Sequence, residues 1–422
     1  MRNATFANET AIRPGVSLEW DRKCHHSKTI DVSLDDPLPS RNPVPTGPTN
    51  RTGTTMTHTR ARYRRATVAI GAALILTAAP IATPPAYADS DVAAFMIGST
   101  GGLYKKTGGQ TVRVHGQQVS SPGGGLTAIR YTNGNSTAYA IGVHGGLVRS
   151  TTTGGDAVGG VTTVGPYGLA PPGAPVSAAG YNVFFVSSFG AVFHKTDQNA
   201  SQPQQITGSI APPGAAVAAI PGPIPGVAFV GTDGALRVVR SISTGIWTTS
   251  LASPPNFATP GAPIAAVSTA AGYVTGLDGR IWRVGLNGGA LPDPWTPTAV
   301  AGVGAAPAGA HLSAVQFSGG PAIVMFAGHD GAIWATSNVS GAWHEPTAAT
   351  AAGVAVAGQP IAATIHGDHI HGDWCGTNWV REIRLPKPRV PVDPDPEPWN
   401  AEFSSFGAWN IQPGAHVVSF VR

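Results

Sequence analysis

One motif recurs along this 422-residue chain at a nearly constant interval: an apolar run, a turn that contains glycine, and a second run. Its clearest copies are VAFVGTDGALRVVR at 227–240, GYVTGLDGRIWRVG at 272–285 and VMFAGHDGAIWATS at 324–337. An Asp-Gly turn between two extended runs is typical of a β-hairpin, and here it predicts a two-residue type I′ turn. The chain is therefore expected to fold as a series of similar hairpins.

The spacing of these turns predicts the architecture. With three weaker copies included, the turn glycines are Gly102, Gly146, Gly190, Gly234, Gly279 and Gly331. Their intervals of 44, 44, 44, 45 and 52 residues are typical of the four-stranded blades of a β-propeller. A degenerate seventh copy, WCGTNWVREI, places Gly376 45 residues after Gly331. We therefore predict an all-β, seven-bladed β-propeller over residues 89–422, with six blades as the alternative if the last copy is not a blade.

A second recurring piece predicts how the ring closes. An apolar strand, often after Pro-Gly-Ala, precedes the hairpins, as in PGAPIAAVS at 260–268. The last copy, PGAHVVSFV at 413–421, has no hairpin after it, whereas the first hairpin, at 95–107, has no such strand before it. Pairing of the C-terminal strand with the N-terminal hairpin would complete a blade from both ends of the chain and leave no open sheet edge.

The distribution of charge excludes one class of function. The whole chain has 26 Lys+Arg and 22 Asp+Glu, of which residues 1–88 hold 11 and 6. Residues 89–422 therefore hold 15 and 16, a net charge of −1. A protein that tracks nucleic acid needs clustered basic residues to neutralise phosphates, so no nucleic-acid partner is expected.

Residues 56–88 have the three regions of a secretory signal peptide. Four arginines precede the apolar stretch 68–79, and Ala-Tyr-Ala at 86–88 fits a cleavage site. Twelve apolar residues are too few to cross a bilayer, so no membrane span is expected after cleavage and the product is predicted to be secreted. Residues 1–55 are polar and aperiodic, which predicts disorder or an over-extended start of translation at Met1 in place of Met56, with a cytosolic extension as the alternative.

The hairpin signature, the PGAPIAAV-like strand and the predicted closure resemble the PLL-like β-propeller lectins of bacteria, with a looser likeness to tachylectin-type propellers. The resemblance covers roughly residues 92–422. It implies calcium-independent binding of glycans, often fucose or related sugars, at shallow sites repeated around the ring. From the motifs of the chain itself we expect no catalysis, no cofactor and no metal.

Aromatic residues mark the blades where sugar is expected to bind. Beyond residue 88, every Trp lies at or after Trp247, so the later blades are the candidates. The candidate ligand-binding residues are Trp282, Arg283, Trp334, Trp343, Trp379 and Arg381. No Trp-Arg-Glu set repeats blade after blade, and packing of these Trp between blades is the alternative.

Two further segments and the absence of an enzyme motif bear on the alternatives to a lectin. The segment IHGDHIHGDWC at 365–375 matches no known zinc spacing, so we interpret it as a polar surface loop. PKPRVPVDPDPEPW at 386–399 is interpreted as an extended insertion in the last blade. The chain lacks the Ser-x-Asp-x-Gly-x-Thr-Trp box of propeller sialidases, so an enzyme is not expected. The main alternative to a lectin is an extracellular protein-binding scaffold, and a propeller glycosidase is a less favoured one. The chain could also form a homo-oligomer.

Overall fold

The structure, a computed structural model, describes residues 92–421 except for 108–109, 117, 153–157, 198–200, 269, 287–296, 319, 340, 377–378, 387–401 and 408–414. The predicted signal peptide, the segment 1–55 and the 386–399 insertion (apart from Pro386) lie outside the described residues. No helix among the described residues is long and apolar enough to cross a membrane.

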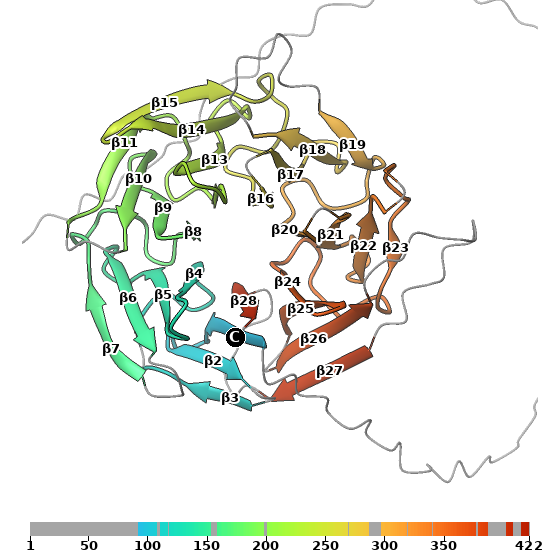
Figure 1. The fold of residues 1–422 in the computed structure, drawn as a ribbon, viewed down its shortest axis with the longest axis horizontal. Coiled ribbons are helices and arrows are strands. Elements are labelled where there is room, and N and C mark those ends of the chain that lie inside the picture. The colour runs from blue at the N-terminus through green and yellow to red at the C-terminus, as the bar shows by residue number, and fades with distance from the viewer. Residues whose placement is uncertain are drawn as a thin grey trace, which may run out of the picture. The chain divides into compact units, whose positions relative to one another are not determined.

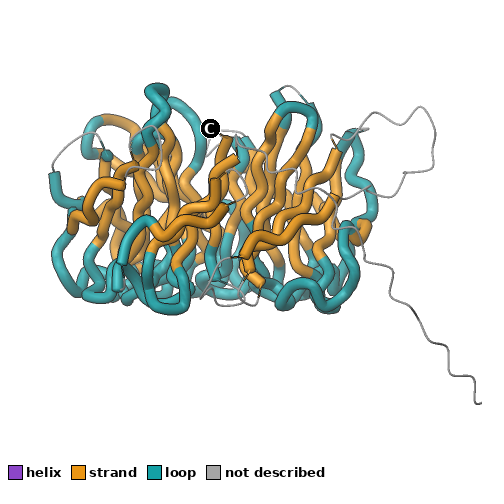
Figure 2. Tube along the Cα trace, turned by 90° about the horizontal axis from the view of Figure 1, so that it is seen from below, coloured by secondary structure: helices purple, strands orange, loops and turns teal. Residues whose placement is uncertain are grey.

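Seven four-stranded antiparallel sheets surround a central axis as the blades of a propeller (Figures 1 and 2). Blade 1 contains β28 (Val417–Val421), β1 (Val92–Ile97), β2 (Leu103–Thr107) and β3 (Gln110–Arg113). Blade 2 contains β4 (Leu126–Arg130), β5 (Ser136–Ile141), β6 (Leu147–Thr152) and β7 (Val158–Thr163). Blade 3 contains β8 (Val176–Ala179), β9 (Asn182–Val186), β10 (Ala191–Thr196) and β11 (Gln204–Ser209).

The later blades repeat this order, with the first strand of each nearest the axis (Figure 1). Blade 4 contains β12 (Val217–Ala219), β13 (Gly226–Val230), β14 (Leu236–Ser243) and β15 (Ile246–Leu251). Blade 5 contains β16 (Ile264–Ala266), β17 (Ala271–Thr275), β18 (Ile281–Gly285) and β19 (Thr298–Ala301). Blade 6 contains β20 (Leu312–Gln316), β21 (Ala322–Ala327), β22 (Ile333–Ser337) and β23 (Thr347–Ala348). Blade 7 contains β24 (Ala362–His366), β25 (His369–Gly376), β26 (Trp379–Pro386) and β27 (Glu402–Gly407).

The seven-bladed prediction is confirmed, including the closure of the ring. β28 from the C-terminus pairs antiparallel with β1, with Val418 opposite Phe95 and Val421 opposite Val92. The degenerate seventh copy forms the middle hairpin of blade 7, so the six-bladed alternative is wrong.

The hydrophobic core lies between blades. Seven clusters of buried apolar side chains are found among the described residues, and each joins two neighbouring blades. The cluster between blades 5 and 6, for example, contains Tyr273 and Ile281 from one blade and Leu312 and Phe326 from the next. Each blade is therefore stabilised mainly by packing against its two neighbours, because the two faces of one sheet are both buried.

The hairpin turns differ from the predicted type. At 231–235 the Gly234 N–H donates to the Gly231 carbonyl at 3.0 Å, and the Gly231 N–H donates to the Ala235 carbonyl at 2.8 Å. Gly234 has a φ of +74°, but Asp233 is not in the left-handed region. The loop is thus a three-residue turn ending in a left-handed glycine, and the two-residue type I′ prediction is wrong.

In the first two copies the left-handed glycine is Gly101 and Gly145, one residue before the glycine assigned from the sequence. The turn aspartates are not in the left-handed region that a type I′ turn would require. Their side chains accept backbone hydrogen bonds within the turn instead. Asp278 Oδ1, for instance, accepts the Arg280 N–H at 3.0 Å, which holds the turn in shape.

Replacing the turn glycine of blade 6 should destabilise the ring. Gly331 has a φ of +71°, and a Cβ there would lie 2.5 Å from the Ala355 carbonyl oxygen. We expect Gly331→Ala to lower the free energy of unfolding by about 2 kcal/mol or more, since backbone strain and a clash add. Gly341→Ala is the control, because Gly341 has a φ of +84° with open space around it. Equal urea midpoints for the two variants would contradict the clash.

Candidate functional site

In four blades an aromatic residue and a basic residue are opposite each other in the middle hairpin, on the face that packs against the next blade. The cross-strand pairs are Phe95 and Lys105, Tyr139 and Arg149, Phe184 and His194, and Tyr273 and Arg283. Each pair lies on the face of its blade that packs against the next blade, because the aromatic side chain belongs to the core between those two blades. The repeat therefore places similar aromatic and basic groups at several interfaces between neighbouring blades; each such interface is called a cleft below.

The cleft between blades 5 and 6 adds a tryptophan to this pair. Trp343, from the connection between β22 and β23, packs edge-to-face on Tyr273 with ring centroids 5.6 Å apart and an interplanar angle of 77°. Trp343 is half-buried and Arg283 is exposed, and both contact Tyr273. Burial raises the pKa of Tyr273, although Arg283, which hydrogen-bonds its hydroxyl, opposes the shift. The cleft thus offers an indole surface next to a positive charge.

The cleft between blades 3 and 4 repeats the arrangement with other residues. Trp247 of β15 lies with its ring centroid 5.0 Å from that of His194 and 6.1 Å from that of Phe184. Burial lowers the pKa of His194 to about 4, with Lys195 adding to the shift. His194 is therefore neutral at pH 7, and its Nε2 lies 2.9 Å from Asn182 Oδ1. This cleft has an indole surface next to an uncharged polar ring.

Among the described residues, no tryptophan packs on the paired residues of the remaining clefts. Lys105 Nζ lies 6.0 Å from the Phe95 ring between blades 1 and 2. Between blades 2 and 3, the hydroxyls of Tyr139 and Tyr131 both donate to the Asp197 carboxylate. Burial and Asp197 raise the pKa of Tyr131 to about 12. Blades 4 and 6 carry small or aliphatic residues at the paired positions. The clefts are therefore unequal, and two of them have both an indole and a basic side chain.

The predicted site residues fall into separate places. Trp282 and Arg283 are neighbours on β18, so their side chains point to opposite faces of blade 5. Trp282 packs towards blade 4, with its ring centroid 5.7 Å from that of Phe257. Arg381 Nη1 donates to the Val354 carbonyl at 3.1 Å. Trp379 begins β26, and its side chain lies outside the described residues.

Trp334 serves the hairpin turn. Its Nε1–H donates to Asp330 Oδ1 at 3.1 Å, and a Cβ on Gly328 would lie 2.6 Å from the same nitrogen. Trp282 covers Gly276 in the same way in blade 5. These two indoles therefore lie over the glycine that opens each turn, which explains the Gly-x-Asp-Gly pattern by packing. Of the predicted residues, the structure places Trp334 and Trp343 against the core between blades 5 and 6, where Arg283 also contacts Tyr273.

Sequence reasoning missed four residues of these clefts: Phe184, His194, Trp247 and Tyr273. A signal for the pairs was present, because the aromatic and basic residues are ten positions apart in all four cases (95 and 105, 139 and 149, 184 and 194, 273 and 283). Trp247 follows no such spacing, and only the packing of blade 3 on blade 4 identifies it.

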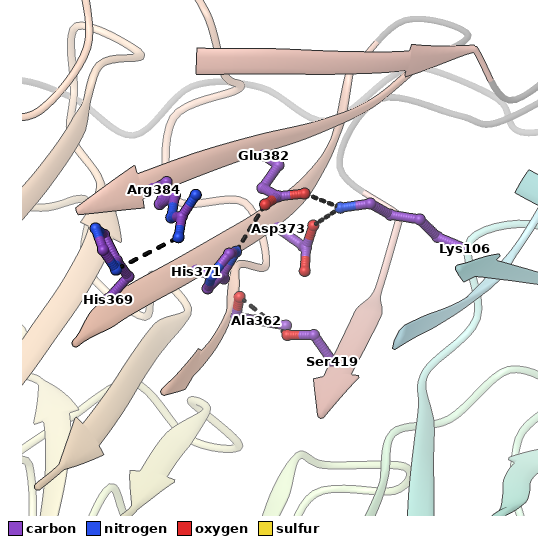
Figure 3. Close-up of polar contacts among 8 residues, drawn as sticks. All are labelled: Lys106, Ala362, His369, His371, Asp373, Glu382, Arg384 and Ser419. Carbon is purple, nitrogen blue, oxygen red and sulfur yellow. Dashed lines mark hydrogen bonds and ion pairs between the residues drawn. The ribbon is translucent and has the colours of Figure 1, made fainter. Parts of the chain in front are cut away.

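The histidine-rich segment 365–375 is not a polar surface loop. It forms the β24–β25 hairpin, and His371 and Asp373 are fully buried against blade 1 (Figure 3). Lys106 Nζ of β2 lies 2.8 Å from Asp373 Oδ1 and also pairs with Glu382, whose other oxygen lies 2.7 Å from His371 Nδ1. We call these four residues the seam cluster. Among the described residues, no group of three or more His, Cys, Asp and Glu could hold a metal ion.

The electrostatics of the seam cluster depend on Lys106. Burial raises the pKa of Asp373, and the Lys106 ammonium opposes that shift. Burial would also raise the pKa of Glu382, but the hydrogen bond with His371 and the charge of Lys106 outweigh it, so the pKa lies below its usual value. The positive charge of Lys106 thus stabilises two buried carboxylates at the interface between blades 7 and 1, where the ring closes.

Comparison with known structures supports the fold. The chain is similar to the BP39L lectin from Burkholderia pseudomallei, with a TM-score of 0.64 and 20% identity, over 77% of this chain and 96% of that one. The two proteins share the β-propeller fold. AofleA from Arthrobotrys oligospora matches at 14% identity over 72% and 90% of the two chains, with a TM-score of 0.48. No protein-family profile and no curated protein sequence matches the chain.

Acid should weaken the protein partly through His194. Its pKa is about 4 in the folded protein against 6.5 for the free side chain, so the unfolded chain binds the proton more readily. Stability is therefore retained above pH 6.5 and is lost as the pH falls from there to about 4. We expect His194→Gln to reduce the fall in melting temperature between pH 7 and pH 4. An unchanged fall would contradict the buried neutral imidazole.

Proposed function

We propose that the protein is a secreted, non-enzymatic propeller that binds carbohydrate in the clefts between blades 3 and 4 and between blades 5 and 6. The observation that carries the proposal is the repeated set of an indole, a second aromatic ring and a basic side chain in those two clefts. The predicted signal peptide supports secretion, and the fold shared with a lectin of known structure supports the choice of ligand.

The chemistry of the two clefts suits a sugar ring. The C–H face of a pyranose is apolar and packs on an indole face, while its hydroxyls need directed donors and acceptors. Trp343 supplies the face between blades 5 and 6, and the Arg283 guanidinium supplies several donors beside it. Trp247 and the neutral His194 supply the same two functions between blades 3 and 4. No divalent ion takes part in this mode of binding.

A glycan array tests the proposal directly. The labelled, purified protein is applied to the array with and without a chelator. We expect saturable binding to a related set of sugars that the chelator does not change. Absence of binding by protein shown to be folded by circular dichroism would overturn the proposal. Turnover of any bound glycan, followed by chromatography of released sugars, would overturn the non-enzymatic part of it.

A further inference from the structure

Two histidine rings meet near the centre of the propeller. His311 comes directly before β20 of blade 6, and His416 comes directly before β28 of blade 1. Their ring centroids are 4.8 Å apart and their planes are inclined by 80°. Blade 7 lies between blades 6 and 1 in the ring, and its β24 is the strand nearest the axis (Figure 1). The two side chains therefore bridge the inner edge of a whole blade.

Both histidines occupy one position of the repeat. They follow Gly-Ala in the turn that leads into the innermost strand, where other blades have Pro175, Ala216 or Pro263. A histidine is thus not required for this turn, and yet the two that occur are placed in contact. In the part of the chain that the structure describes, neither imidazole makes a hydrogen bond. Both residues are half-buried, so a ligand from solvent can reach them.

Both rings are in the form that binds metals. Burial lowers the pKa of His311 to about 3, with His416 adding to the shift, and burial lowers the pKa of His416 to about 4. At pH 7 each ring therefore has one nitrogen with a free lone pair, and binding requires no loss of a proton.

We propose that His311 and His416 form a two-histidine site for a divalent transition-metal ion at the centre of the ring, with water completing the coordination. Two imidazoles bound at about 2.1 Å to neighbouring positions of one ion have ring centroids about 5 Å apart. The observed separation of 4.8 Å is close to this distance. Imidazole ligands suit Cu²⁺, Ni²⁺ and Zn²⁺. The ion would link blade 6 to β28, the strand that closes the ring.

Titration of the intact, untagged protein with NiCl₂ and with CuCl₂ tests the proposal. We expect one saturable site per chain by calorimetry, a rise in melting temperature because the ion binds only the folded ring, and a Cu²⁺ resonance spectrum with coupling to two imidazole nitrogens. His311→Ala and His416→Ala should each abolish the site. The alanine is compatible with the turn, since blade 4 has Ala216 at the same position.

Two control variants make the result decisive. His329→Ala removes an exposed histidine from the β21–β22 turn and should leave binding unchanged. His366→Ala alters the other contact between histidines, in which the rings of His366 and His371 lie 6.1 Å apart. Loss of binding in His366→Ala but not in His311→Ala would overturn the proposal. Absence of saturable binding by the unaltered protein would overturn it as well.

Discussion

Replacing Lys106 with Met should cost about 3–5 kcal/mol in the free energy of unfolding, because it leaves two carboxylates buried without their cation. Asp373 is fully buried and Glu382 is 5% exposed, and both lie against Lys106 across the seam between blades 7 and 1 (Figure 3). Urea denaturation followed by tryptophan fluorescence measures the loss.

Two further variants separate charge from packing at the seam. Arg237→Met breaks the Asp233–Arg237 pair on a hairpin turn, which is partly exposed, and should cost about 0–1 kcal/mol. Lys106→Met combined with Asp373→Asn and Glu382→Gln removes all three charges and should recover most of the stability. A loss in Lys106→Met no larger than that in Arg237→Met would show that the seam cluster does not hold the ring closed.

Deleting residues 416–422 should prevent the ring from closing. The deletion removes β28, whose pairing with β1 completes blade 1. It also uncovers Phe95 and Met96, which have no exposed surface in the closed ring. An open apolar sheet edge favours association with other chains, so we expect aggregated protein without a cooperative thermal transition.

A peptide supplied in trans controls for non-specific damage by the deletion. A synthetic peptide of residues 413–422 should restore a soluble monomer and a cooperative transition, whereas a scrambled peptide should not. A shortened chain that stays monomeric and melts within a few degrees of the full chain would contradict the role of β28.

Much of the fold could be predicted from the sequence because the repeat is local. Each blade needs a hairpin turn between its second and third strands. The turn glycine has no room for a side chain where the connection to the next blade passes over it, as at Gly190, where a Cβ would clash with the Ala211 carbonyl oxygen. The assignment was one residue off in blades 1 and 2 because a glycine pair occurs there, and only φ distinguishes Gly101 from Gly102. The closure was predictable from the unequal ends of the pattern.

The candidate site was predictable only in part, because it is formed between blades. Trp282 and Trp334 recur next to the turn glycine, but the pattern reflects indoles packed over Gly276 and Gly328. Trp343 meets Tyr273 from the connection between β22 and β23, which lies outside the repeated hairpin motif. The burial of the histidine-rich hairpin was missed because its charged partner, Lys106, lies 267 residues from Asp373.

Calorimetric titration with a sugar identified on the array tests the central claim most directly. The account predicts two bound sugars per chain, one in Trp343→Ala and one in Trp247→Ala, and none in the double variant, with Trp282→Ala unchanged as the matched control. Loss of a contact worth about 1.4 kcal/mol weakens binding tenfold, so the loss of each indole should be measurable as a lost binding site. Undiminished binding by the double variant, or loss of binding in Trp282→Ala alone, would contradict the account.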